Sequence, residues 1–392
     1  MATPVQLPWS EELLTYDFGP GHPMSPVRLR LTMDLIRALG LLDHPAVSVV
    51  ESEAATDAVL QTVHELSYIE AVRAGQYGRE DESRGLGTDD NPVFPRVHEA
   101  SAQIVGATVA GARAVWSGAV GHAVSLAGGM HHAMPGAASG FCIYNDVAIA
   151  IRWLLAHGCE RVLYVDVDAH HGDGVERTFW DDPRVLTVSV HQSGTSIFPG
   201  TGYAQDVGGP NARGSAVNVS LPPETSDVPW LRSLDAVVRP LAEEFLPQII
   251  VSQHGCDTHR RDPLTRMDVS VDGQRAAALL IAEWAEQYAG GRWLATGGGG
   301  YDITSTVPRV WAHLVAASAG IELDPATEVP RIWRDEVRKL GDGDVPETMG
   351  DGRDVTFRTW LDGFDPENDV DRAIMATRRG VFPWHGLDPL TT

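Results

Sequence analysis

Apolar residues fall in two alternating patterns through most of this 392-residue chain. Short apolar runs predict strands that are buried on both faces. They are Val120–Leu126, Arg161–Val167, Val185–Val190, Ile249–Ser252 and Arg292–Ala295. Longer segments between them have helical periodicity: Val97–Trp116, Val147–Ala156, Val228–Phe245, Val271–Tyr288 and Val307–Ala317. Strands and helices that alternate in this way predict a parallel, doubly wound α/β sheet.

Composition narrows the classes of partner. The chain has 30 Lys and Arg against 53 Asp and Glu, a net charge of −23, which repels phosphate backbones and anionic lipid. We therefore expect no direct nucleic-acid binding and no membrane binding, although a basic partner would suit this charge. Three cysteines are too few for a disulfide framework and fit a reducing compartment, so we expect a cytoplasmic protein. Met1–Glu12 lacks the basic and apolar regions of a signal peptide.

Polar clusters directly follow the five predicted strands. They are Gly128–His132, Asp166–Asp173, His191, Gln253–Asp257 and Gly297–Tyr301. Ligand sites in open α/β sheets form just outside the carboxyl ends of the strands, so the five clusters should converge in space. The sequence therefore predicts one site built from all of them.

One of these clusters has the pattern of a metal site. Extended chain alternates its side chains, which places Asp166, Asp168 and His170 on one side of a buried strand, a costly arrangement without a metal or partners. Asp168, His170 and Asp257 supply two oxygens and one nitrogen and leave positions open for water and substrate. This donor set suits zinc, with ferrous iron as an alternative. Such a metal would lower the pKa of its water and polarise an amide carbonyl.

Hydrolysis of an amide also needs a base, an acid and an oxyanion donor. His131 and His132 suit the proton transfers, with Asp166 as the partner of His131 and Asp173 as the partner of His132. Tyr301, after four glycines, is the candidate oxyanion donor. A serine nucleophile is not indicated because the chain has no Gly-x-Ser-x-Gly elbow. Free buried cysteines ordinarily behave as small hydrophobes rather than as nucleophiles.

The order of these motifs resembles that of the histone deacetylase family, in particular its class I pattern and its bacterial acetoin-utilization branch. The resemblance runs from about Tyr16 to Ala317. Its matching stretches are Gly21–Arg28, Gly128–His132, Ala138–Cys142, Asp166–Glu176, Phe198–Gly202, Gln253–Asp257 and Gly297–Tyr301. It implies a single-domain arginase/deacetylase-like α/β fold with a central, mostly parallel sheet of about eight strands and helices on both faces. The catalytic domain would cover residues 1–320, and residues 321–392 would form a C-terminal extension packed on it.

The same resemblance implies an activity and further residue roles. The activity is metal-dependent hydrolysis of N-ε-acetyl-lysine, in proteins or peptides, to lysine and acetate; acyl-CoA synthetases fit as substrates by analogy. Gly140, Phe141, Phe198 and Leu264 would line a tunnel for the lysine stem. Asp90 would hold the substrate backbone, and Arg28 would line a channel for acetate.

Two structural potassium ions are also implied. One would bind at Asp166, Asp168, His170, Ser189 and Val190, and the other at Phe179, Asp182 and Val185. The chain departs from the family pattern at His254 and Cys256, and in the loop Gln192–Ile197. The tunnel rim and the peptide preference therefore stay open.

Three alternatives remain beside the lysine deacetylase. One is an enzyme of the same fold that acts on acetylpolyamines or other small acylated amines. Another is an arginase-like enzyme with two manganese ions, which needs an additional set of metal ligands. The last is a silent acyl-lysine reader, which would be expected to lack a metal ligand or the tyrosine. The sequence does not indicate an oligomeric state.

Overall fold

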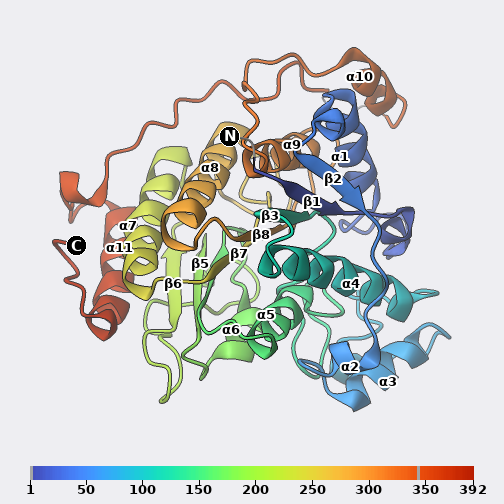
Figure 1. Ribbon diagram of the computed structural model, residues 1–392, viewed down its shortest axis with the longest axis horizontal. Helices are drawn as coiled ribbons and strands as arrows, with labels where there is room; N and C mark the ends of the chain where they lie inside the picture. The colour runs from blue at the N-terminus through green and yellow to red at the C-terminus, as the bar shows by residue number, and fades with distance from the viewer. Residues whose placement is uncertain (1–2, 342–344) are drawn as a thin grey trace.

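The computed structural model describes residues 3–341 and 345–392, and at its centre lies an eight-stranded sheet (Figure 1). The strand order is β2-β1-β3-β8-β7-β4-β5-β6, and every neighbouring pair is parallel. The strands are β1 (Val5–Pro8), β2 (Val47–Val50), β3 (His122–Ser125), β4 (Val162–Asp166), β5 (Val185–Gln192), β6 (Ala216–Leu221), β7 (Ile249–Gln253) and β8 (Trp293–Thr296). The predicted arginase/deacetylase-like α/β fold is confirmed.

All five predicted strands are present, as β3, β4, β5, β7 and β8. These five are consecutive in the sheet and are flanked by β1 and β2 on one side and by β6 on the other. The sequence analysis missed the three flanking strands. β2 is an edge strand whose last three residues are exposed, and β6 alternates apolar and polar residues over only six positions. Neither segment has the continuous apolar run of a central parallel strand.

Helices cover both faces of the sheet. The helices are α1 (Val27–Ala38), α2 (Asp57–Leu60), α3 (Leu66–Gly75), α4 (Val97–Trp116), α5 (Asp146–Ala156), α6 (Asp173–Phe179), α7 (Asp227–Phe245), α8 (Val271–Tyr288), α9 (Thr306–Ser318), α10 (Arg331–Arg338) and α11 (Asp369–Val381). Figure 1 shows α1, α9, α8 and α7 above the strands, where they pack in that order, and α4, α5 and α6 below them. The five predicted helices are therefore confirmed as α4, α5, α7, α8 and α9.

Residues 321–341 and 345–392 cross the outside of the upper helix layer (Figure 1). At one end, the Trp333 indole N–H on α10 donates to the Leu31 carbonyl on α1 at 2.8 Å. At the other end, α11 packs against β6 and α7, and Asp371 on α11 forms a buried ion pair with Arg232 on α7 at 2.8 Å. Breaking such a buried pair typically costs about 3–5 kcal/mol. Among the described helices, none combines the length and the hydropathy that a membrane span requires.

Candidate active site

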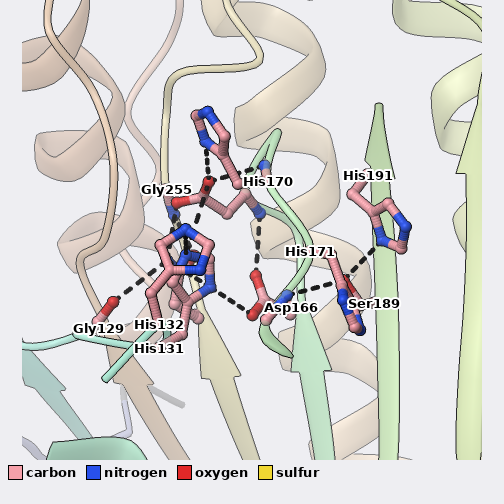
Figure 2. A network of polar contacts seen from close by, with 12 residues as sticks. Gly129, His131, His132, Asp166, His170, His171, Ser189, His191 and Gly255 are labelled. Carbon is pink, nitrogen blue, oxygen red and sulfur yellow. Dashed lines mark hydrogen bonds and ion pairs between the residues drawn. The ribbon is translucent and has the colours of Figure 1, made fainter. Parts of the chain in front are cut away.

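The parallel topology brings the polar clusters to one edge of the sheet. The five strands that precede them are neighbours and point the same way, so their carboxyl ends lie side by side. Figure 2 shows the result: His131 and His132 lie beside each other and face Asp166 and His170 from the end of β4. Ser189 and His191 lie on the adjacent strand β5. His131 and His132 belong to the segment between β3, which ends at Ser125, and α5, which begins at Asp146.

Three side chains at this edge have the arrangement of metal ligands. His170 Nδ1 lies 3.1 Å from Asp168 Oδ1 and 2.9 Å from Asp257 Oδ2. All three residues are buried, and one ligand atom from each lies within 4.8 Å of the others. Two carboxylate oxygens and one imidazole nitrogen at this spacing fit a divalent metal ion and leave coordination positions open.

Surrounding hydrogen bonds fix which carboxylate oxygens face the centre. Gly299 N–H and Gln253 Nε2 each donate to Asp168 Oδ2 at 2.8 Å. Ala169 N–H donates to Asp257 Oδ1, also at 2.8 Å. One oxygen of each aspartate is therefore occupied, and the other is directed at His170. The sequence alone does not indicate the role of Gln253, because that role depends on β7 lying next to β4, where Gln253 is opposite Asp166.

The charges at this centre favour a cation. Burial, together with the charge of Asp168, raises the pKa of Asp257 to about 6. Burial by itself would lower the pKa of His170, but the charge of Asp257 and the hydrogen bonds to both aspartates outweigh it and raise this pKa to about 10. A proton on His170 thus offsets part of the negative charge. A divalent ion between the same three atoms would take the place of that proton.

The two neighbouring histidines are each backed by a carboxylate. His131 Nδ1–H donates to Asp166 Oδ2 at 2.8 Å, and His132 Nδ1–H donates to Asp173 Oδ1 at 2.7 Å. Their Nε2 atoms face each other at 3.0 Å, so they share one proton. Burial would lower the pKa of His131, but the charge of Asp166 outweighs it and raises the pKa to about 9. Burial and the charge of His131 lower the pKa of His132 to about 4. His131 is therefore the cation of the pair, and His132 is neutral.

A cavity of about 330 Å³ leads from the surface to this centre. Its lining includes every residue that the family resemblance assigns to substrate binding, three of the proposed catalytic and metal residues, and two residues that were not predicted: Asp90, Gly140, Phe141, Phe198 and Leu264, then His132, His170 and Tyr301, and finally Ser196 and Ile197. Phe198 and Leu264 keep 43% and 38% of their surface exposed, so they mark the mouth. Ser196 and Ile197 were missed because they lie in the loop where the sequence departs from the family pattern.

Gly140 shows how closely the cavity is packed. A Cβ atom at this position would lie 2.5 Å from the His132 ring and 2.9 Å from the Phe198 ring. Its φ of +52° is also a conformation that residues with side chains rarely adopt. Glycine is therefore needed for both its size and its backbone.

Tyr301 lies at the end of the glycine run that follows β8. Its backbone N–H donates to Asp262 Oδ2 at 2.8 Å, and its ring packs edge-on against Phe141. Burial, and then the charge of Asp257, raise the pKa of Tyr301 well above its usual value, so the hydroxyl remains a donor. The preceding glycines let the backbone pass against the carboxylates, since a Cβ on Gly299 would lie 2.2 Å from Asp257 Oδ2.

Arg28 is buried behind the centre, beside a separate small cavity that Tyr16, Met24 and Met130 also line. Its Nη1 donates to the Gly298 carbonyl at 2.7 Å, and its guanidinium lies 5.2 Å from the centre of the Trp311 ring. Within the described residues it has no carboxylate partner. A buried guanidinium without an anion favours negative charge nearby, although the cavity beside it has a volume of only about 10 Å³.

The residues of the first potassium set lie where β4 pairs with β5. Asp166 is opposite Ser189 in this pair, and Asp168, His170 and Val190 lie within four positions of them along the two strands. The Ser189 hydroxyl donates to His191 Nδ1 at 2.8 Å, because His191 Nε2–H is held by the Gly202 carbonyl. The Ser189 proton is therefore directed at His191, and the Ser189 oxygen accepts from Gly172 N–H at 3.5 Å, which leaves one lone pair for coordination.

The second potassium set forms the turn between α6 and β5. Asp182 N–H donates to the Phe179 carbonyl at 3.0 Å, and Val185 N–H donates to the Asp182 carbonyl at 3.1 Å. The Asp182 carboxylate pairs with Arg152 and Arg184. The three residues are thus close together, and the carbonyls of Phe179 and Asp182 already accept hydrogen bonds within the turn.

Comparison with known proteins agrees with this site. The model of the histone deacetylase domain matches residues 22–318, and the chain therefore belongs to the histone deacetylase family. The fold and the family together define a deacetylase, a hydrolase that acts on acetylated substrates. The family also suggests a divalent metal, which the buried Asp168, His170 and Asp257 group is able to hold.

Three similar curated relatives are bacterial proteins. The chain is 40% identical over 351 residues to the acetoin utilization protein AcuC of Bacillus subtilis (strain 168), which covers 88% of this chain and 90% of that protein. It is 36% identical to AcuC of Staphylococcus xylosus, with 88% and 90% covered. AcuC of Staphylococcus aureus (strain MSSA476) is 39% identical, with 78% and 79% covered.

Proposed function

We propose that this protein is a lysine deacetylase that hydrolyses N-ε-acetyl-lysine, in proteins or peptides, to lysine and acetate. The observation that carries the proposal is the cavity, which leads past two phenylalanines to His132, His170 and Tyr301. Such a passage suits an acyl group on an extended apolar stem, and the methylenes of lysine provide that stem. By analogy alone, we also propose metabolic enzymes such as acyl-CoA synthetases as the protein substrates.

Asp168, His170 and Asp257 would hold the metal, for which we propose zinc, with ferrous iron as the alternative that these ligands also accept. When bound, the ion would polarise the acetyl carbonyl and lower the pKa of a water molecule. Asp166, Asp168, His170, Ser189 and Val190 are the proposed ligands of one structural potassium ion. Phe179, Asp182 and Val185 are the proposed ligands of a second.

His132 is the group that we assign to proton transfer. It is neutral, it lines the cavity, and its Nε2 is the ring nitrogen that no carboxylate occupies. Its Nε2 faces Nε2 of His131 at 3.0 Å, and an attacking water would replace that contact before His132 takes the proton of the water and delivers it to the leaving amine. Asp173 fixes its tautomer and stabilises the imidazolium that forms. His131, held charged by Asp166, supplies a fixed positive charge beside the reacting carbon.

Tyr301 and Arg28 complete the assignment. The Tyr301 hydroxyl, which keeps its proton, donates to the oxyanion of the tetrahedral intermediate, and loss of such a donor typically lowers the rate by about 10²–10³. Arg28 offers acetate a buried positive charge in the cavity behind the centre. Asp90 at the mouth of the tunnel is the proposed acceptor for substrate backbone N–H groups.

The catalytic domain would end near residue 320, with residues 321–392 as its packed extension. The three buried free cysteines suit a cytoplasmic location.

Acetate release tests this proposal directly. The purified protein is given an acetyl-lysine peptide and, separately, an N-acetylpolyamine. Each substrate is tested as isolated, after chelation, and after addition of zinc or ferrous iron. We expect peptide turnover that chelation abolishes and that one of the two metals restores. Turnover of the polyamine alone would reassign the substrate to small acylated amines. A folded, metal-loaded protein that turns over neither substrate would favour the silent reader.

A further inference from the structure

The wall of the tunnel contains a turn whose backbone conformation is unusual for its residues. Ser139 N–H donates to the Cys142 carbonyl at 3.1 Å, and Cys142 N–H donates to the Ser139 carbonyl at 2.9 Å. This pair closes a two-residue turn in which Gly140 and Phe141 have φ values of +52° and +67°. Turns with both central residues at positive φ favour Asn and Gly, because a Cβ is strained there. Phe141 carries that strain.

Tyr16 holds the backbone of this strained residue. Its hydroxyl donates to the Phe141 carbonyl at 2.7 Å. Its ring is fixed from behind by edge-on contacts with Phe18 and Phe94, at centroid distances of 5.1 and 5.7 Å. Burial raises the pKa of Tyr16 well above its usual value, so the hydroxyl remains a donor. A carbonyl that is held by a rigid partner cannot rotate freely, and the residue that bears it cannot relax to negative φ.

The Phe141 ring is held as well. On one side it meets the edge of the His22 ring at 4.7 Å, and on the other it meets Tyr301 at 5.7 Å. His22 Nδ1 accepts from Met24 N–H at 3.1 Å, so its proton is on Nε2, which donates to the Asp90 carbonyl at 3.2 Å. The packing around Phe141 therefore extends from the mouth of the tunnel to the proposed oxyanion donor.

We propose that Tyr16 is a positioning residue of the tunnel: its hydroxyl holds Phe141 in the left-handed conformation that forms the wall against the substrate stem. This inference rests on the proposed deacetylase function. Tyr16 lies outside the cavity that receives the stem and has no contact with the proposed metal ligands, so its effect on turnover passes through Phe141. Loss of the hydroxyl lets the turn relax and widens the wall, which weakens substrate binding more than it slows the chemical step.

Tyr16→Phe removes the hydroxyl and keeps the ring, and Tyr68→Phe is its matched control. Tyr68 is also buried, and its hydroxyl donates at the same 2.7 Å to the carbonyl of Ile143, which does not line the cavity. In the metal-loaded full chain we expect Tyr16→Phe to raise KM for an acetyl-lysine peptide about 3- to 10-fold, the range for one lost hydrogen bond, with a smaller change in kcat. Tyr68→Phe should leave KM unchanged. Equal KM changes in the two variants, or none in Tyr16→Phe, would overturn the proposal.

A double-mutant cycle with Phe141→Gly separates positioning from a general structural role. Glycine keeps the carbonyl that the Tyr16 hydroxyl contacts, but it adopts positive φ without strain, so loss of the hydroxyl no longer shifts a strained residue or an aromatic wall. Tyr16→Phe should then change KM by less than about 2-fold. An undiminished effect of Tyr16→Phe in the glycine background would contradict the role assigned to it.

The same cycle measured by urea unfolding needs no substrate. Tyr16→Phe should destabilise the parent chain less than it destabilises the Phe141→Gly chain, because relaxation of the strained Phe141 offsets part of the lost hydrogen bond and glycine has no such strain to release. Equal losses of unfolding free energy in the two chains would overturn the role of Tyr16 in holding Phe141. A wild type that releases acetate from no acetyl-lysine peptide would refute the proposed function, and the unfolding cycle would still test the inference on Tyr16.

Discussion

Gln253 offers a sharp test of how the metal ligands are held. It is fully buried at the end of β7, its Nε2 donates to Asp168 Oδ2 at 2.8 Å, and its Oε1 accepts from Gly255 N–H at 2.6 Å. Gln253→Leu keeps a side chain of similar size and removes both hydrogen bonds. Gly299 N–H still donates to Asp168 Oδ2, so the ligand set should survive with one of its two supports lost.

Two estimates of the effect on metal affinity agree. Removing a partner of a metal ligand typically lowers metal affinity about 10- to 100-fold. That corresponds to about 1.4–2.8 kcal/mol, the same range as the roughly 1.5–3 kcal/mol assigned to a hydrogen bond with a charged group. We therefore expect zinc affinity to fall by this factor. Leaving Gly255 N–H buried without an acceptor should also lower the free energy of unfolding by about 1–3 kcal/mol.

The measurement is competition for zinc with a chromophoric chelator, alongside urea unfolding of the metal-free chain. Gln274→Leu is the matched control, since Gln274 is also buried and its Nε2 donates to Thr258 Oγ1 and the Cys256 carbonyl, not to a proposed ligand. The control should lose stability and keep its zinc affinity. Wild-type affinity in Gln253→Leu, or an equal loss of affinity in both variants, would refute this account of the support of Asp168.

Three further predictions concern proton transfer, metal binding and the C-terminal segment. His132→Ala should abolish acetate release while the folded protein keeps one metal per chain by elemental analysis; a folded variant without metal would show that His132 is a ligand. Zinc binding should release about one proton from His170 near neutral pH. Calorimetry in buffers of different ionisation enthalpy measures this release, and a value near zero would contradict the assignment of a proton to metal-free His170. Burial alone would raise the pKa of Asp351, but the hydrogen bond of Asp351 to His259 and the charge of Arg309 outweigh burial and hold this pKa well below its usual range. The ionised Asp351 therefore stabilises the fold above the unfolded pKa near 4, and this stabilisation is lost as the pH falls further. Asp351→Asn should accordingly lower the free energy of unfolding by about 2–4 kcal/mol at neutral pH, and the difference from wild type should narrow below about pH 4. A difference that does not change with pH would refute the ionised Asp351 carboxylate as its source.

The central part of the fold was predictable because burial and chain direction leave a strong sequence signal there. Val162–Asp166 is buried at every position, and such strands are continuous apolar runs. The edge strand Val47–Val50 carries no such signal, because three of its four residues are exposed. Convergence of the polar clusters followed from parallel topology alone, without knowledge of which strand lies beside which.

Contacts that depend on strand order, or on backbone conformation, were not predictable. Gln253 supports Asp168 only because β7 pairs with β4, although the two strands are far apart in the sequence. Phe141 has a positive φ that its residue type disfavours, and nothing in the local sequence indicates the Tyr16 hydroxyl that lies 125 positions away and contacts it. The roles of the individual site residues stay predictions, which the variants above address.

Metal titration of the chelated protein tests the central claim most directly, with acetate release from an acetyl-lysine peptide as the readout for wild type and Tyr301→Phe. A single site built from Asp168, His170 and Asp257 predicts that wild-type activity rises with added zinc or ferrous iron and saturates at one ion per chain. Tyr301→Phe should bind the same single ion and release acetate about 10²- to 10³-fold more slowly. Saturation only at two ions per chain would favour the binuclear alternative, and wild-type turnover by Tyr301→Phe would contradict the proposed oxyanion donor.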